Sequence, residues 1–237
     1  MLCNTTTSVD GALVKPLRSA RDLGIYIAAD LVMRTHVQRT ISRCFAVLRQ
    51  LRQIPHSVPT DTFQTLVVSL VLTRMDYGNS LLAGHPVYLV RRLQSVLNAA
   101  ARLTYHLQRS HHISDALACL HWLRLNERIE FKIAVLTFKV IHGVAPGYLG
   151  PFTRVADLPS RRSLRSVDNN CLIMPTSRLS TVGSRAFPIA GPQTCNGLPE
   201  DVTSAESLTT FRRLLKTHLL RKSFPDYLLE LAVFFAT

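Results

Sequence analysis

Apolar residues recur along much of the chain at spacings of three and four, which predicts a series of amphipathic helices. The first series begins at Thr35, and Gln38 follows it at the spacing of a capping box. Its apolar residues are Val37, Ile41, Cys44, Leu48 and Leu51. We expect these side chains to form the buried stripe of a first helix, because one face of a helix repeats with that period.

Two more helices are expected directly after the first. Pro59 and Thr60 open the second, and Gly78 ends it, because glycine readily adopts the left-handed conformation that follows a helix. Pro86 opens the third, in a first turn where its missing N–H is not needed. The apolar residues are Phe63, Leu66, Val67, Leu70 and Met75 in the second helix, and Leu89, Leu93, Val96, Ala100 and Leu103 in the third. Three consecutive amphipathic helices predict a bundle-like unit.

Helical periodicity returns in three later segments. A short helix is expected over residues 114–120, and a longer one begins at an Asn126 cap and ends at Gly143 and Pro146. Ser207 is placed to cap a last helix. The apolar residues of these two longer helices are Ile129, Ile133, Leu136 and Val140, and then Leu208, Phe211, Leu215 and Leu219.

Two segments lack the helical pattern. Residues 21–27 (RDLGIYI) are apolar and β-branched around one glycine, which predicts a short strand or hairpin. Over residues 147–204 Pro, Ser, Thr and Arg accumulate, so loops are expected there, with short extended pieces such as residues 172–174. The chain is therefore predicted to be mainly α, and its 237 residues, 47% of them hydrophobic, form one large domain or two small ones.

Positive charge changes the picture from a plain helical domain to a candidate binding protein. The chain has 28 Lys and Arg against 15 Asp and Glu, a formal net charge of +13. Such a surface attracts phosphate, which makes nucleic acid the default partner; a basic protein without such a partner is the alternative.

The arginines are arranged along the expected helices. One group of arginines lies opposite the apolar stripe of the first helix. Another group lies on the third expected helix, which has almost no acidic residues, and the last group forms a basic loop. The groups are Arg39, Arg43 and Arg49; Arg91, Arg92, Arg102 and Arg109; and Arg161, Arg162 and Arg165. A solvated helix face is the usual reading, but the missing acids favour contact with phosphates. Tyr26, Tyr105 and Trp122 could either stack on bases or belong to the core.

Motifs for catalysis and metal binding are absent from the sequence. There is no G-x-x-x-x-G-K-[ST], G-x-S-x-G or H-E-x-x-H, and the histidines and cysteine near residues 111–121 lack the paired spacing of a tetrahedral site. Single aspartates cannot hold a pair of metal ions, so Asp76 before Gly78 is expected to be a turn residue. We therefore expect no catalytic residue and no metal ligand.

Cysteine usage and hydropathy bear on the compartment. The five cysteines lie far apart in the sequence without a C-x-x-C pair, which indicates neither a disulfide framework nor a zinc knuckle and fits a reducing compartment. The longest uncharged run, residues 63–73, is too short to span a bilayer. The expectation is an intracellular protein without a membrane partner, with nucleus and cytoplasm left open.

Several blocks, taken in order, resemble the region after the palm in reverse transcriptases of non-LTR (LINE-type) retrotransposons. Residues 21–27 with Leu31 and His36 are similar to the primer-grip strands and the entry to the thumb, and residues 74–79 (RMDYGN) followed by Gly84 are similar to a thumb motif. Residues 93–103, 120–149 and 191–199 match the segments that follow. Cys195 departs from the tryptophan that such elements usually have there.

The resemblance implies a thumb-like fold and an organisation in five parts. These are residues 1–33, the end of the palm and primer-grip-like strand region; 34–110, a thumb-like helical bundle; 111–149, further C-terminal helices; 150–204, a loop-rich basic segment; and 205–237, a C-terminal helix and tail. The primer-grip-like residues are Leu23, Gly24, Ile25 and Tyr26. In the family the catalytic aspartates lie upstream of these blocks, and Mg²⁺ is implied only for that palm, so no cofactor is expected in this chain.

Three functions remain open at this point. The first is a non-catalytic remnant that binds RNA or an RNA–DNA duplex through phosphate contacts and packs against the palm and fingers of the parent polymerase. The second is one part of a longer, active RNA-directed DNA polymerase. The third is an unselected transposon fragment or a protein-interaction module.

Overall fold

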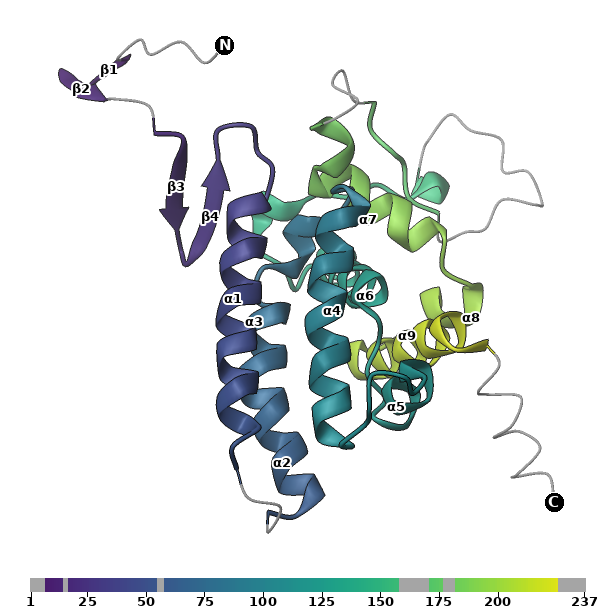
Figure 1. Ribbon diagram of the computed structural model, residues 1–237. Coiled ribbons are helices and arrows are strands. Elements are labelled where there is room, and N and C mark those ends of the chain that lie inside the picture. The colour runs from purple at the N-terminus through teal and green to yellow at the C-terminus, as the bar shows by residue number, and fades with distance from the viewer. Residues whose placement is uncertain (1–6, 15–16, 55–57, 158–170, 177–181, 226–237) are drawn as a thin grey trace.

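The computed structural model is mainly helical and begins with two short β-hairpins, which confirms the expected fold class (Figure 1). The structure describes residues 7–14, 17–54, 58–157, 171–176 and 182–225. Strands β1 (Thr7–Val9) and β2 (Ala12–Val14) pair antiparallel, as do β3 (Ser19–Asp22) and β4 (Ile25–Ala28). The strand or hairpin predicted over residues 21–27 is the tip of the second of these hairpins.

The turn between β3 and β4 is held in a left-handed conformation. Asp22 pairs with Ile25, so Leu23 and Gly24 form a two-residue loop, and both have positive φ, 44° and 85°. This is the backbone of a type I′ turn, whose twist matches that of the flanking strands. Glycine adopts it freely, whereas leucine rarely does, so the tip contains one unfavourable residue whose side chain is exposed.

The three expected helices form a bundle in which two helices run side by side. Helix α1 (Arg34–Leu51) lies beside α4 (Val87–Thr104), and both run in the same direction (Figure 1). The segment between them returns as α2 (Thr60–Val67), the π-helical η1 (Val68–Leu72) and α3 (Thr73–Asp76). This segment is the second expected helix, interrupted by a π-helical stretch, and it ends before Gly78 at φ 68°.

Two of the three predicted helix caps are wrong. Met33 is the N-cap of α1, so Thr35 lies inside the helix, and the buried Met33 side chain explains the earlier start. Helix α6 (Leu125–Ile141) starts before Asn126, because the Gln94 side chain of α4 accepts a hydrogen bond of 2.8 Å from the Leu125 N–H. The third prediction is confirmed.

That third cap is Ser207. It begins α9 (Leu208–Ser223), and its hydroxyl oxygen accepts a hydrogen bond of 3.1 Å from the Thr210 N–H. A local side chain satisfies the helix terminus here, which is why the sequence was sufficient to find it.

The expectation of loops over residues 147–204 is wrong in part. Helices α7 (Phe187–Asn196) and α8 (Glu200–Thr203) lie there, besides the short 3₁₀ helices η3 (Gly147–Leu149), η4 (Val155–Asp157) and η5 (Gly183–Arg185). Glycine and two prolines hide the periodicity of α7. The extended piece is confirmed at Leu172, which bridges to Arg154.

Close packing against α6 stabilises α7. A Cβ added to Gly191 would lie 2.7 Å from Oγ1 of Thr137 on α6, so only glycine allows this approach. The Asn196 side chain then hydrogen-bonds both backbone groups of Leu172, at 2.8 and 2.9 Å. Tertiary contacts therefore compensate for a sequence with low helix propensity.

Helix α6 is shared by two hydrophobic cores. Ile129 and Ile133 belong to the larger core, which joins the α1–α4 bundle to the remaining elements η2 (Asn79–Leu82) and α5 (Ile113–Cys119). Val135 and Phe138 belong to the smaller core with α8 and α9, where the Phe138 and Phe211 rings stack at 4.4 Å. Because both faces are buried, α6 anchors the C-terminal helices to the bundle.

Among the described helices, none combines the length and the apolar character needed to cross a membrane.

The burial of cysteines predicts their order of alkylation. Burial raises the pKa of Cys44 to about 11, against the opposing effect of Arg74, and raises the pKa of Cys195 to about 12. At about pH 8 only ~0.1% or less of such thiols is thiolate, the reactive form, so exposed Cys119 should react with iodoacetamide before Cys44 and Cys195. Mass spectrometry of peptides resolves each site. In urea Cys44, Cys119 and Cys195 should become equally reactive, and equal rates without urea would contradict the packing.

Candidate nucleic-acid interface

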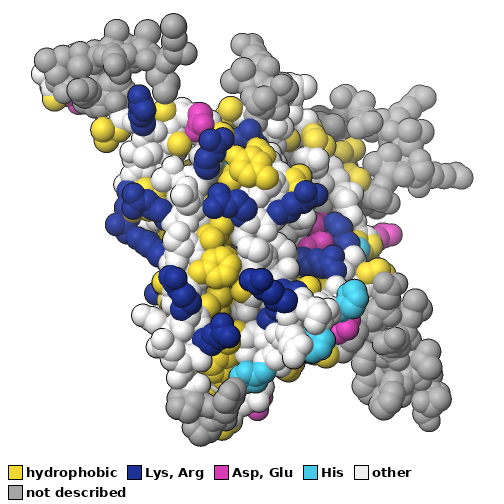
Figure 2. Space-filling model, in the orientation of Figure 1, with side chains coloured by type: hydrophobic (Ala, Val, Ile, Leu, Met, Phe, Trp, Pro, Cys, Tyr) yellow, Lys and Arg dark blue, Asp and Glu magenta, His cyan; other side chains and the backbone are white. Residues whose placement is uncertain are grey.

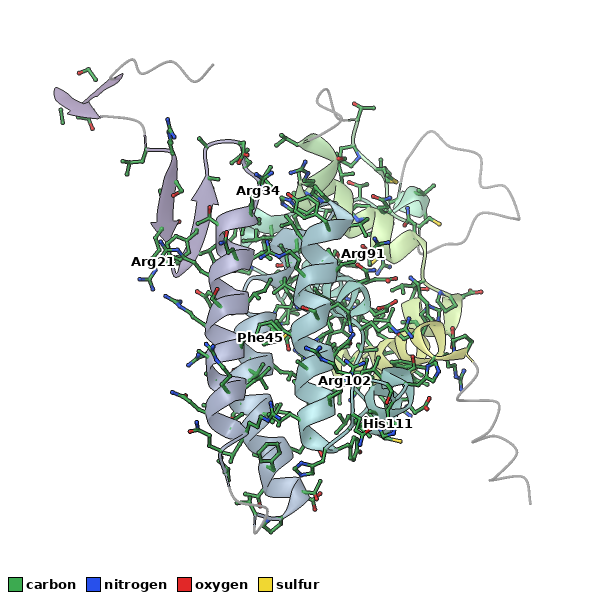
Figure 3. All side chains as sticks on the ribbon, viewed as in Figure 1. Arg21, Arg34, Phe45, Arg91, Arg102 and His111 are labelled. Atoms are coloured by element: carbon green, nitrogen blue, oxygen red, sulfur yellow. The ribbon has the colours of Figure 1, made fainter. Side chains whose placement is uncertain are left out.

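The face formed by α1 and α4 carries basic side chains on both sides of an apolar strip (Figure 2). Phe45 of α1 lies between the two helices, and Arg91 and Arg102 project from α4 (Figure 3). The parallel packing of two amphipathic helices explains this arrangement. The apolar stripes turn inward, and the polar faces, rich in arginine, remain on the same side of the molecule.

A groove of about 820 Å³ lies between the C-terminal halves of the two helices. Its floor is apolar and includes Phe45, Leu48 and Leu103, while arginines stand on both walls. These are Arg49 and Arg52 on the side of α1, and Arg102 and Arg109 on the side of α4 and the turn after it. No lining residue is acidic, so the rim presents positive charge that this groove does not neutralise.

Arg102 is the most enclosed cation of the groove. The residue is half-buried, and its Nε is buried without a hydrogen-bond partner among the described atoms. A buried donor without a partner is costly, typically about 1–3 kcal/mol. This enclosure distinguishes Arg102 from an arginine that is fully solvated.

The three arginines predicted to share a face of α1 lie in different surroundings. Arg39 packs on the Tyr26 ring, with its guanidinium carbon 4.3 Å from the ring centroid, and donates a 3.0 Å hydrogen bond to the Tyr26 hydroxyl. Arg43 lines a second hollow beside the β3–β4 hairpin. Of these three arginines, Arg49 alone lines the groove. Arg102 and Arg109 line it from the side of α4.

The remaining predicted arginines divide into two sets. Arg91 and Arg92 are exposed on α4, above the groove, whereas Arg161, Arg162 and Arg165 lie outside the described residues. The ion pairs among the described residues are those of Arg128 with Asp76 and of Lys222 with Glu130. Within the described part of the chain, no acid therefore pairs with a groove arginine.

Sequence patterns alone missed Arg52 and Phe45. Arg52 follows Arg49 by three positions and so shares its side of α1, a spacing that could have identified it. Phe45 gave no such signal, because its place in the floor depends on how closely α4 approaches α1.

The four primer-grip-like residues attach the hairpin to the helices. The Tyr77 hydroxyl donates a hydrogen bond to the Leu23 carbonyl, and the Tyr77 ring lies 3.5 Å from where a Cβ of Gly24 would be. Ile25 packs so closely on Gly78 that a Cβ there would be 2.7 Å from its Cδ1. With Tyr26 on Arg39, each residue of the set has a contact that fixes the hairpin beside α1 and α3.

Asp76 is held in an ion pair that joins α3 to α6. Arg128 donates hydrogen bonds to both carboxylate oxygens of Asp76, and the bond from its Nε to Oδ1 is 2.8 Å long. The Asn79 side-chain amide donates a third hydrogen bond to the same carboxylate, at 3.3 Å. The carboxylate therefore has a structural role at the turn where it was expected. Within the described residues, no group of three or more His, Cys, Asp or Glu side chains could hold a metal ion.

The three aromatic residues considered for base stacking differ in how far they are exposed. Trp122 is buried in the larger core. Tyr26 is half-buried under Arg39, and Tyr105, at the end of α4, is partly exposed. A further exposed ring is Tyr88, 43% exposed, on the same helix as Arg91 and Arg92.

Comparison with known proteins gives no further identification, since no family model, curated protein or solved structure matches the chain. The resemblance to reverse transcriptases stays a prediction from the sequence.

Replacing Asp76 by Asn should lower the free energy of unfolding by about 1–3 kcal/mol, because Arg128 is mostly buried and would lose its counter-charge. Urea unfolding measures this. The matched variant is Arg128→Met, and the double variant should lose less than the sum of the two single variants, with a coupling of about 1 kcal/mol or more. Additive losses would show that the pair contributes nothing beyond its separate side chains.

Proposed function

We propose that this chain binds RNA or an RNA–DNA duplex without sequence preference, through phosphate contacts of the α1–α4 face. The observation that carries the proposal is a groove with arginines on both walls and no acid among its lining residues. Arginine matches phosphate oxygens with a planar, permanently charged fork of donors. Phosphate contacts position a nucleic acid but do not read its sequence, so low specificity follows.

The groove geometry favours a backbone ligand over unpaired bases. Its floor is mainly aliphatic, with Phe45 half-buried and Phe63 buried, whereas single-strand binding sites present exposed aromatic rings to successive bases. Arg91 and Arg92 continue the positive surface along α4 beyond the groove. A duplex that lies along the two parallel helices would place phosphates near both walls.

The resemblance to non-LTR reverse transcriptases supports the same role. We propose that the chain is a non-catalytic remnant of such an enzyme, whose thumb-like bundle would contact the duplex behind the active site. An alternative is that it acts as part of a longer RNA-directed DNA polymerase, with catalysis and Mg²⁺ supplied by a palm. The proposed interface is the same under both alternatives.

The hairpin side of the bundle is the proposed contact with palm and fingers. The side chains of Leu17, Leu23 and Leu31 are 70%, 82% and 48% exposed, and every residue of β3 is exposed. Exposed apolar side chains and an unpaired strand edge are typical of a surface that another protein segment covers. The arginine groove and this edge are separate, so one ligand does not exclude the other.

Fluorescence anisotropy with a labelled RNA–DNA duplex tests the proposed interface. We expect a Kd of about 10⁻⁴ to 10⁻⁶ M at physiological salt, weakening as salt rises. Replacing Arg49, Arg52, Arg102 and Arg109 by Gln should weaken binding and reduce the slope of log K against log salt by up to about 3.6, because each neutralised phosphate contributes about 0.9.

The control variant removes four cations from α9 instead, at Arg212, Arg213, Lys216 and Arg221, all exposed. It has the same net charge as the groove variant but leaves the groove intact, so its slope should stay close to that of the unmodified protein. Equal slopes in both variants would show that total charge, and not this groove, determines binding. Primer extension by the purified chain alone would contradict the non-catalytic proposal.

A further inference from the structure

A second hollow lies on another side of α1, under the tip of the β3–β4 hairpin. Its volume is about 570 Å³, and it shares no lining residue with the arginine groove. Three elements build it: the hairpin tip, α1, and α3 with the residue that follows it. The lining residues are Gly24, His36, Thr40, Arg43, Thr73, Arg74 and Tyr77.

The lining is polar and cationic. Arg43 comes from α1 and Arg74 from α3, so two guanidinium groups reach one hollow from different helices, with His36 and the Thr40 hydroxyl beside them. No carboxylate is among the lining residues, and the described residues give neither arginine an ion-pair partner. Two exposed cations thus line one hollow without an acid among its lining residues.

The effect of both arginines is visible on neighbouring groups. Burial and the charge of Arg43 both lower the pKa of His36, so the imidazole is neutral at physiological pH. Arg74 acts on the Cys44 thiol, where its charge opposes the larger effect of burial. Two arginines and no lining carboxylate give the hollow a positive potential, and its histidine is a neutral hydrogen-bonding group.

Two lining side chains of the hollow, Tyr77 and Thr73, are held by hydrogen bonds without a ligand. Tyr77 forms one wall and is held by its hydrogen bond to the Leu23 carbonyl, with Gly24 against its ring. Thr73 is held by a hydrogen bond from its hydroxyl to the Ser69 carbonyl. These two side chains need not be ordered when a ligand binds, which reduces the entropic cost of binding.

We propose that this hollow binds a phosphate monoester or free phosphate, with Arg43, Arg74 and Thr40 as donors to its oxygens. A monoester carries up to two negative charges, which the two guanidinium groups match, whereas a backbone diester carries only one. The volume lies within the range of small-ligand sites, about 300–1,000 Å³, and leaves room for a nucleoside attached to the phosphate. This inference does not rest on the arginine groove.

Titration of the full chain with inorganic phosphate and with adenosine monophosphate tests the proposal. Two-dimensional NMR should show saturable shifts of the Thr40 amide and the His36 ring, in a background of about 150 mM chloride that screens non-specific attraction. Arg43→Gln with Arg74→Gln should weaken binding at least tenfold. Arg49→Gln with Arg102→Gln removes the same charge from the groove and should leave phosphate affinity unchanged.

Thr40→Val serves as a second variant that keeps the shape and charge of the hollow, and it should weaken phosphate binding by a few-fold without lowering the melting temperature. Linear, non-saturating shifts, or equal weakening by the hollow and groove variants, would overturn the proposal.

Comparing the affinities of two duplexes, one with a 5′-phosphate and one with a 5′-hydroxyl, identifies the source of the phosphate. A preference for the phosphorylated end that only the hollow variant loses indicates a strand terminus. Equal affinity for both duplexes, with saturable binding of the small ligands, indicates a free phosphate or nucleotide.

Discussion

The packing of α1 against α4 is the contact on which the rest of the molecule depends. Val37 and Cys44 on α1, and Leu89 and Val96 on α4, are completely buried, with α2, η1 and α3 completing the core behind them. Burying one face of each helix leaves the opposite faces on a common side. Because those faces are rich in arginine and poor in acid, the hydrophobic core also determines where positive charge accumulates.

The other elements are attached to this bundle by a few specific polar contacts. Asp76 and Arg128 join α3 to α6, Gln94 holds the start of α6 against α4, and Tyr77 joins α3 to the hairpin. These contacts also place the hollow under the hairpin, since the residue after α3 forms one of its walls. The same turn at residues 76–79 therefore organises both the C-terminal half and the proposed phosphate site.

Periodicity was sufficient to predict the main helices, because their stability comes from apolar stripes that the sequence displays. Ser207 was found for the same reason: its cap is made by a neighbour three residues away. Distant partners could not be found this way. The start of α6 depends on Gln94, α7 depends on Gly191 lying against Thr137, and the arginines of α1 face different sites because the hairpin occupies one side of the helix. The arginine pattern of the sequence indicated a binding surface. Only the packing of the hairpin and the helices shows that these arginines line two separate sites, the groove and the hollow.

The proposed interface places nucleic acid along the groove between α1 and α4. Ultraviolet cross-linking of a bound RNA–DNA duplex, followed by mass spectrometry of the attached peptides, tests where it lies. Cross-links should be concentrated in peptides covering residues 45–54 and 99–109, the two walls of the groove. Cross-links confined to α9, or spread evenly over the basic surface, would contradict it.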